Sequence, residues 1–239
     1  MEPGYEEEVR RRLADVRRRI AAAAGRAGRD PASVGLVIVT KGQPVARLRA
    51  VLGEGPRCFG ENRVEEALPK IDALGSPALS WHLIGPLQSR KVRLVADHFE
   101  LIHAVDRLKV ARLLDATAAA LGRRQAVLLE WNVSGEATKA GWRVDDREGD
   151  AHSLEDVRQI LSLSNLEVRG LMTVGPLSGD AEVQRKAFRR LAAMRERLAR
   201  TLGCVLPELS MGMSDDFETA VEEGATLVRI GRAILGERM

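Results

Sequence analysis

The most informative segment is Val34-Gly35-Leu36-Val37-Ile38-Val39, which runs directly into Thr40 and Lys41. It is short, apolar and rich in β-branched residues, and polar residues do not alternate with the apolar ones. Such a run is typical of a strand that is covered on both faces in a parallel sheet. A helical stretch follows from about Pro44 to Leu52, so the segment predicts a strand-then-helix unit.

The same alternation continues to the end of the chain. Seven more strands are predicted, at Arg57–Phe59, Ser80–Leu83, Leu101–Ala104, Ala126–Asn132, Leu166–Met172, Glu208–Met211 and Thr226–Ile230. Between them the pattern predicts helices at Val64–Leu74, Ser89–Ala96, Arg107–Leu121, Leu154–Leu163, Val183–Leu202 and Asp215–Glu223. An extra helix precedes the first strand, because apolar residues lie there at helical spacing, namely Val9, Leu13, Val16 and Ile20.

Eight strands that alternate with helices in 239 residues match the count and size of a (β/α)₈ TIM barrel. We therefore expect an α/β protein in which residues 1–239 form a single barrel domain with an extra N-terminal helix. A doubly wound open sheet is the alternative. The first strand-to-helix turn, Thr40-Lys41-Gly42-Gln43, lacks the GxGxxG fingerprint of a dinucleotide-binding sheet.

The composition is that of an ordinary globular protein, with 45% hydrophobic and 30% charged residues. The net charge of +3 does not indicate nucleic-acid binding, because basic residues are interleaved with acidic ones and aromatic residues make up only 3%. The acidic N-terminus lacks the apolar core of a signal peptide, and no apolar run is long enough for a membrane span. We expect a cytoplasmic protein whose two cysteines, Cys58 and Cys204, are reduced.

Functional residues of a (β/α)₈ barrel gather where the strands end, and the first strand ends at Lys41. Desolvation at the barrel mouth would favour the neutral amine, which is the form that attacks an aldehyde. Lysine is scarce in this chain beside arginine, and only lysine can form a Schiff base. The alternative is a solvated lysine in a loop.

Polar residues also follow other strands. Asn62 follows the second strand and would orient a bound ring, or else cap the next helix. His82 lies on the third strand and would stack near a ring, or else bond to a core carbonyl. Lys139 lies in the long loop after the fifth strand, near an entrance or as plain surface charge.

The last two strands predict an anion site. After the seventh, the small residues of Ser210-Met211-Gly212-Met213-Ser214 allow backbone N–H groups and hydroxyls to converge. At the end of the eighth, Arg229 adds a positive charge and Gly231 exposes the backbone. The loops after these strands are the usual phosphate site of such barrels. A lysine on strand one opposite a phosphate site is a constellation for pyridoxal 5′-phosphate.

Other chemistries find no support in the sequence. It contains no HExxH, no cysteine–histidine cluster of metal ligands, no GxxxxGK[ST] and no GxSxG. We therefore expect no metal site.

Several segments, taken in order, resemble the pyridoxal phosphate homeostasis proteins, the YggS/PROSC group. The matching segments are Val39-Thr40-Lys41, Phe59-Gly60-Glu61-Asn62, Trp81 through Ser89, Val105 through Lys109, Asn132 through Glu136, Arg169 through Met172, Leu209 through Phe217, and Val228-Arg229-Ile230-Gly231. The FGEN, WHxIGPLQS and LSMGMSDDFE motifs are highly specific together, and the similarity runs from about residue 9 to residue 237.

This resemblance implies a fold like the barrel domain of alanine racemase without that enzyme's second domain. It implies that Lys41 is the Schiff-base lysine and that Ser210, Gly212, Met213, Arg229 and Gly231 lie around the phosphate or the ring nitrogen, with Asn62 and His82 as the remaining predicted cofactor contacts. The resemblance also favours a monomer whose partners are pyridoxal phosphate and pyridoxal-phosphate-dependent apo-enzymes.

Two positions depart from the family's usual pattern. Gly42 stands where threonine is usual, and Arg232 where a small hydroxyl residue is common. Both departures affect the details of the predicted phosphate site and not the assignment of the lysine.

The sequence favours a carrier of the cofactor over an enzyme. Pyridoxal enzymes need an acid or base beside the substrate, and the one tyrosine here, Tyr5, lies close to the N-terminus. We therefore expect no catalytic residues. An amino-acid racemase or decarboxylase relative is the enzymatic alternative. A cofactor-free Schiff-base aldolase and a scaffolding protein are two others.

Overall fold

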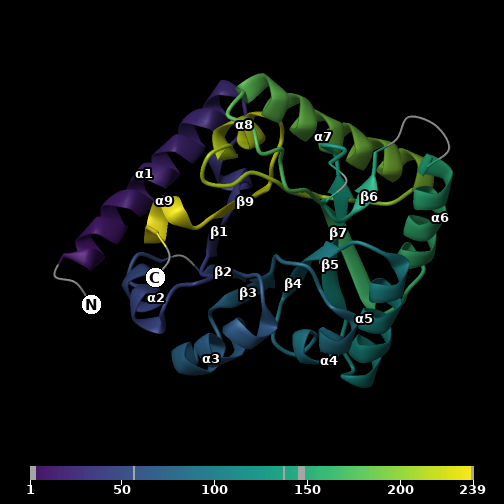
Figure 1. Cartoon of the computed structure of the whole chain (residues 1–239), viewed down its shortest axis with the longest axis horizontal. Helices are drawn as coiled ribbons and strands as arrows, with labels where there is room; N and C mark the ends of the chain where they lie inside the picture. The colour runs from purple at the N-terminus through teal and green to yellow at the C-terminus, as the bar shows by residue number, and fades with distance from the viewer. Residues whose placement is uncertain (1–3, 56, 137, 145–148, 238–239) are drawn as a thin grey trace.

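A computed structural model describes residues 4–55, 57–136, 138–144 and 149–237. Eight parallel strands form a closed barrel, because the sheet order β4-β3-β2-β1-β9-β8-β7-β5 is completed by pairing between β4 and β5 (Figure 1). These strands are β1 (Gly35–Val39), β2 (Cys58–Glu61), β3 (Ser80–Leu83), β4 (Leu101–Val105), β5 (Gln125–Asn132), β7 (Leu166–Met172), β8 (Glu208–Ser210) and β9 (Leu227–Ile230). The predicted (β/α)₈ barrel is confirmed.

Strand β1 lies between β2 and β9, and the buried apolar residues of the barrel form two clusters. Ile38 is fully buried and packs with the helix-facing core outside the barrel. A second, smaller cluster is made of strand residues alone, Leu101, Ala104, Ala126, Leu128 and Met172, and fills part of the barrel interior. Both faces of the strands are therefore covered, which explains why the apolar runs show no polar alternation.

Helices surround the strands (Figure 1). They are α1 (Tyr5–Arg26), α2 (Val45–Leu52), α3 (Val64–Leu74), α4 (Val92–Val95), α5 (Leu108–Ala120), α6 (Gly149–Leu161), α7 (Ala181–Leu202), α8 (Phe217–Glu222) and α9 (Arg232–Leu235). The extra N-terminal helix, α1, packs against α2, α8 and α9 with the apolar stripe that the sequence predicts. The hydroxyl of Tyr5 donates to the carbonyl of Leu235 at 2.9 Å, so α1 is joined to the last helix.

Some elements differ from the predictions. A ninth strand, β6 (Trp142–Arg143), pairs with the end of β5 in the segment between the predicted strand Ala126–Asn132 and the predicted helix Leu154–Leu163, where the sequence predicts no strand. The helix predicted at Ser89–Ala96 starts as a 3₁₀ turn at Ser89–Lys91 before α4. Helix α8 begins at Phe217 and not at Asp215, because the carboxylate of Asp216 turns back to accept from the backbone N–H of Met213 at 2.5 Å. None of the described helices is long and apolar enough to cross a membrane.

Candidate functional site

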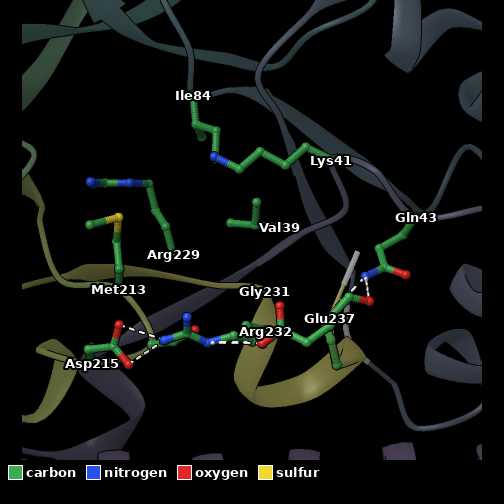
Figure 2. Close-up of a pocket in the computed structure, with 12 residues that line it drawn as sticks. Val39, Lys41, Gln43, Ile84, Met213, Asp215, Arg229, Gly231, Arg232 and Glu237 are labelled. Atoms are coloured by element: carbon green, nitrogen blue, oxygen red, sulfur yellow. Dashed lines mark hydrogen bonds and ion pairs between the residues drawn. The ribbon is translucent and has the colours of Figure 1, made fainter. Parts of the chain in front are cut away.

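A cavity of about 420 Å³ lies where β1 and β9 end. Its lining comes from the end of β1, the loops after β3 and β8, and the end of β9 with the segment that follows. Four predicted site residues line it together, namely Lys41, Met213, Arg229 and Gly231. Figure 2 shows the side chain of Lys41 reaching into this cavity toward the side on which Arg229 and Met213 lie.

Lys41 occupies a tight turn directly after β1. The N–H of Thr40 donates to the carbonyl of Gly60 on β2 at 3.0 Å, and the N–H of Gln43 donates back to the carbonyl of Thr40 at 3.1 Å. Gly42 has a φ of 69°, a left-handed conformation that a threonine would adopt only with strain. The glycine that departs from the family's usual residue is therefore suited to this turn.

Arg229 is the buried cation of the cavity, with 4% of its surface exposed. One guanidinium nitrogen donates to the hydroxyl of Ser210 at 2.6 Å, and the other donates to the carbonyl of Thr173 at 2.8 Å. Burial lowers the pKa of Arg229 to about 10, so the group is still charged at neutral pH. The barrel therefore places a fixed positive charge at the cavity that Lys41 enters.

A chain of hydrogen bonds extends from Arg229 into the barrel interior. Ser210 Oγ lies 2.8 Å from His103 Nδ1, and His103 Nε2 lies 2.9 Å from His82 Nδ1. Burial lowers the pKa of His82 to about 4 and that of His103 well below its usual value, so both rings are neutral. The Ser210 hydroxyl accepts from Arg229. If it donates to His103 Nδ1, then His103 Nε2 carries the proton that is donated to His82 Nδ1.

The remaining predicted residues lie in other places. Gly212 has a φ of 94°, and a Cβ there would lie 2.6 Å from Ala220 Cβ, so this glycine allows close packing against α8. Asn62 lines a separate cavity of about 290 Å³, together with Arg63 and Gln88. The structure thus brings Asn62 to a neighbouring strand end without placing it among the residues that line the Lys41 cavity. His82 is not among the residues that line the Lys41 cavity, and it is linked to Arg229 by the hydrogen bonds through His103 and Ser210.

The Lys139 ammonium is already paired. It lies 2.7 Å from a carboxylate oxygen of Glu136 and donates to the carbonyl of Gly175 at 2.8 Å. This arrangement suits the alternative in which the residue carries local charge.

Charged residues form the rim of the cavity. Arg232 makes two hydrogen bonds to Asp215, at 2.6 and 2.7 Å, and its side chain is 55% exposed. The amide of Gln43 donates to the carbonyls of Gly236 and Glu237, which fixes the segment after α9 beside the β1 turn. Figure 2 shows these contacts along one side of the cavity.

Among the hydrogen-bond partners of Ser210 and Arg229, sequence reasoning missed His103 and Thr173. His103 is fully buried, and a histidine within the apolar run of β4 was the one available signal of an internal hydrogen bond. The carbonyl of Thr173 gave no signal, because any residue supplies a backbone acceptor. No group of residues suited to holding a metal ion occurs in the described part of the chain.

Comparison with known proteins gives concordant results. The family model of the alanine racemase N-terminal domain matches residues 12–239. A pyridoxal phosphate homeostasis protein of Pseudomonas aeruginosa is 47% identical over 226 residues, which cover 95% of this chain and 94% of that protein. The Escherichia coli protein of the same name is 39% identical over 235 residues, 97% of each chain.

Solved structures agree with this relationship. The structure of PipY from Synechococcus elongatus with pyridoxal phosphate bound is similar with a TM-score of 0.82 at 36% identity, covering 95% of this chain and 100% of that one. A Clostridium difficile alanine racemase shares the fold with a TM-score of 0.73 at 15% identity, and the match spans 56% of that enzyme. With such identity over nearly its whole length, the chain belongs to the pyridoxal phosphate homeostasis proteins, within the alanine racemase N-terminal domain family.

Proposed function

We propose that this chain binds pyridoxal 5′-phosphate as a Schiff base on Lys41 and carries it in intracellular vitamin B6 homeostasis, with no catalytic turnover of its own. The observation that supports this most directly is the shared cavity of Lys41 and Arg229 at the barrel mouth. In one cavity, an amine can react with the aldehyde of pyridoxal phosphate while a buried cation binds its phosphate or ring nitrogen.

The residues present fit this cofactor. The cavity volume lies within the range of about 300–1,000 Å³ that is usual for small-molecule sites. Arg229 and Gly231 would hold the phosphate or the ring nitrogen, while Val39, Ile84 and Met213 would flank the ring. Pyridoxal phosphate supplies an aldehyde, with which the Lys41 amine condenses with loss of one water.

In this proposal Ser210 orients Arg229 and does not itself contact the cofactor. Its hydroxyl is engaged by Arg229 and His103, so it fixes the direction of the guanidinium. The neutral imidazole behind it adds no charge that would compete with Arg229. The predicted contributions of Ser210 and His82 therefore pass through Arg229.

Two observations favour a carrier over an enzyme. The tyrosine of this chain is used to join α1 to α9, so its hydroxyl is committed to a backbone carbonyl. The PipY protein has been solved both with and without pyridoxal phosphate, and this chain matches the two structures with TM-scores of 0.82 and 0.84. A fold that is the same in both states suits uptake of the cofactor and its transfer to apo-enzymes.

The test combines absorption spectroscopy with borohydride reduction and mass analysis of the labelled peptide. Wild-type protein mixed with pyridoxal phosphate should show a visible band and carry the label on Lys41, and Lys41→Ala should lose both. Lys109→Ala is the matched control, because that lysine is exposed on α5 and lines neither cavity described above. Label on another lysine, or no label, would refute the proposal.

A second measurement tests the absence of turnover. Loaded protein should transfer the cofactor to a pyridoxal-phosphate-dependent apo-enzyme and should leave amino acids unchanged. Racemisation or decarboxylation at ordinary enzymatic rates would show that the protein is an enzyme.

A further inference from the structure

A buried ammonium lies directly behind Lys41. Lys70 is on α3, and its side chain is only 7% exposed. Its Nζ lies 2.6 Å from Glu61 Oε1, 2.7 Å from Glu66 Oε1 and 2.7 Å from the carbonyl oxygen of Thr40. An ammonium has three donors, and here each has its own acceptor.

These acceptors hold the chain on both sides of Lys41. The Thr40 carbonyl precedes Lys41, and the N–H of Gly42, which follows it, donates to the same Glu66 oxygen that Lys70 binds. The hydroxyl of Thr40 also donates to Glu61 Oε1, at 2.5 Å. One ammonium thus fixes the peptide groups that flank Lys41, directly on one side and through a carboxylate on the other.

Simple stabilisation of the core does not account for this cluster. Taking an ion pair out of water costs so much that apolar side chains of similar size often stabilise a core equally well. Glu61 is fully buried, and its second oxygen, Oε2, has no hydrogen-bond partner among the described residues. The arrangement is better explained by the need to hold one particular turn in one particular conformation.

We propose that Lys70 is a positioning residue, whose ammonium fixes the turn at residues 40–42 so that the Lys41 amine points into the cavity. The inference rests on the proposed Schiff base at Lys41. It assigns Lys70 an effect on the covalent step and none on the noncovalent contacts made by the β9 side of the cavity.

The experiment separates those two steps with two ligands. Pyridoxal phosphate reports both anchoring and Schiff-base formation, whereas 4′-deoxypyridoxine 5′-phosphate has the same ring and phosphate but no aldehyde. We expect Lys70→Met to form the Schiff base about tenfold more slowly, since misplacement of a reacting group by ~1 Å can cost up to about a hundredfold. The same variant should bind the deoxy analogue within about twofold of wild type, because the anchoring groups are untouched.

Two further variants complete the test, at a temperature where every protein is folded. Glu66→Gln keeps an oxygen that can accept from Gly42 and Lys70 but removes the negative charge. It should therefore also slow Schiff-base formation, but less than Lys70→Met does. Arg185→Met is the control, because it breaks pairs to Glu222 and Glu223, at 2.8 and 2.7 Å, that do not line the cavity. It should lower stability and leave the rate of Schiff-base formation unchanged.

The outcomes are distinct. If Lys70→Met weakens binding of the deoxy analogue as much as it slows Schiff-base formation, Lys70 has a general structural role and the inference is overturned. An unchanged rate of Schiff-base formation in Lys70→Met would also overturn it. If Lys70→Met fails to fold, Glu66→Gln decides, and an unchanged rate in that variant overturns the inference. Failure of borohydride to label Lys41 in wild-type protein would instead refute the proposed function itself.

Discussion

Replacing Ser210 by alanine should destabilise the protein by about 3 kcal/mol. Two buried hydrogen bonds end on its hydroxyl, from Arg229 at 2.6 Å and with His103 at 2.8 Å. A buried hydrogen bond to a charged group contributes about 1.5–3 kcal/mol and a neutral one about 1 kcal/mol. The substitution leaves both partners buried, so their desolvation is no longer compensated.

Urea unfolding followed by circular dichroism measures this loss. We expect the midpoint to fall while the slope m is unchanged, because the folded structure and the unfolded surface stay the same. Ser162→Ala is the control, since that hydroxyl donates to the carbonyl of Gln159 on the exposed end of α6 and should contribute less than about 0.5 kcal/mol. A loss below about 1 kcal/mol for Ser210→Ala would show that Arg229 and His103 do not depend on this hydroxyl.

Two further predictions concern stability. Burial, with a smaller contribution from Asp106, raises the pKa of Glu130 from its ordinary 4.5 to about 7. Between these two pH values the folded protein keeps a proton that the unfolded chain releases, so the free energy of unfolding should fall by about 3 kcal/mol from pH 4.5 to pH 7. In urea titrations at the two pH values, Glu130→Gln should remove most of this fall. An identical fall in the variant would contradict the assignment to Glu130. Gly170→Ala should lower the free energy of unfolding by about 3 kcal/mol or more, because the new Cβ would lie 1.9 Å from the carbonyl oxygen of Glu208 on β8. Gly179→Ala is the control, because a Cβ there would have no atom within 4 Å, and it should leave the melting temperature nearly unchanged. A melting temperature for Gly170→Ala equal to that of wild type would show that β7 and β8 separate without cost.

The sequence was sufficient for the barrel because its signals are local. The longer strands are apolar or β-branched runs, the shorter ones recur between helical patterns, and the structure places each of the eight within a few residues of the prediction. Elements β6 and α9 were missed because two and four residues are too few for a periodicity to appear.

The candidate site was predictable only in part. Lys41, Arg229 and Gly231 could be identified because each stands at a strand end, and strand ends meet at one face of a barrel. The position of Asn62 depends on a tertiary contact with Gly85. The two backbones pack so closely that a Cβ on residue 85 would lie 2.5 Å from the carbonyl oxygen of Asn62.

Lys70 shows why the rest could not be predicted. In the sequence it follows Glu66 by four residues on a helix, which is the pattern of an exposed ion pair. Its contact with the carbonyl of Thr40, 30 residues away, is made only when α3 packs beside β2 and the turn after β1.

The pairing of β1 with β9 has a consequence for the order of events during synthesis. Leu36 pairs with Val228, so the strand that precedes Lys41 acquires its second neighbour only after nearly all the intervening chain has been made. Until then β1 has one unpaired edge on the nascent chain, and Lys41 has no Arg229 opposite it. A ribosome-bound fragment that ends before β9 therefore cannot assemble the cavity, and loading with cofactor would follow closure of the barrel.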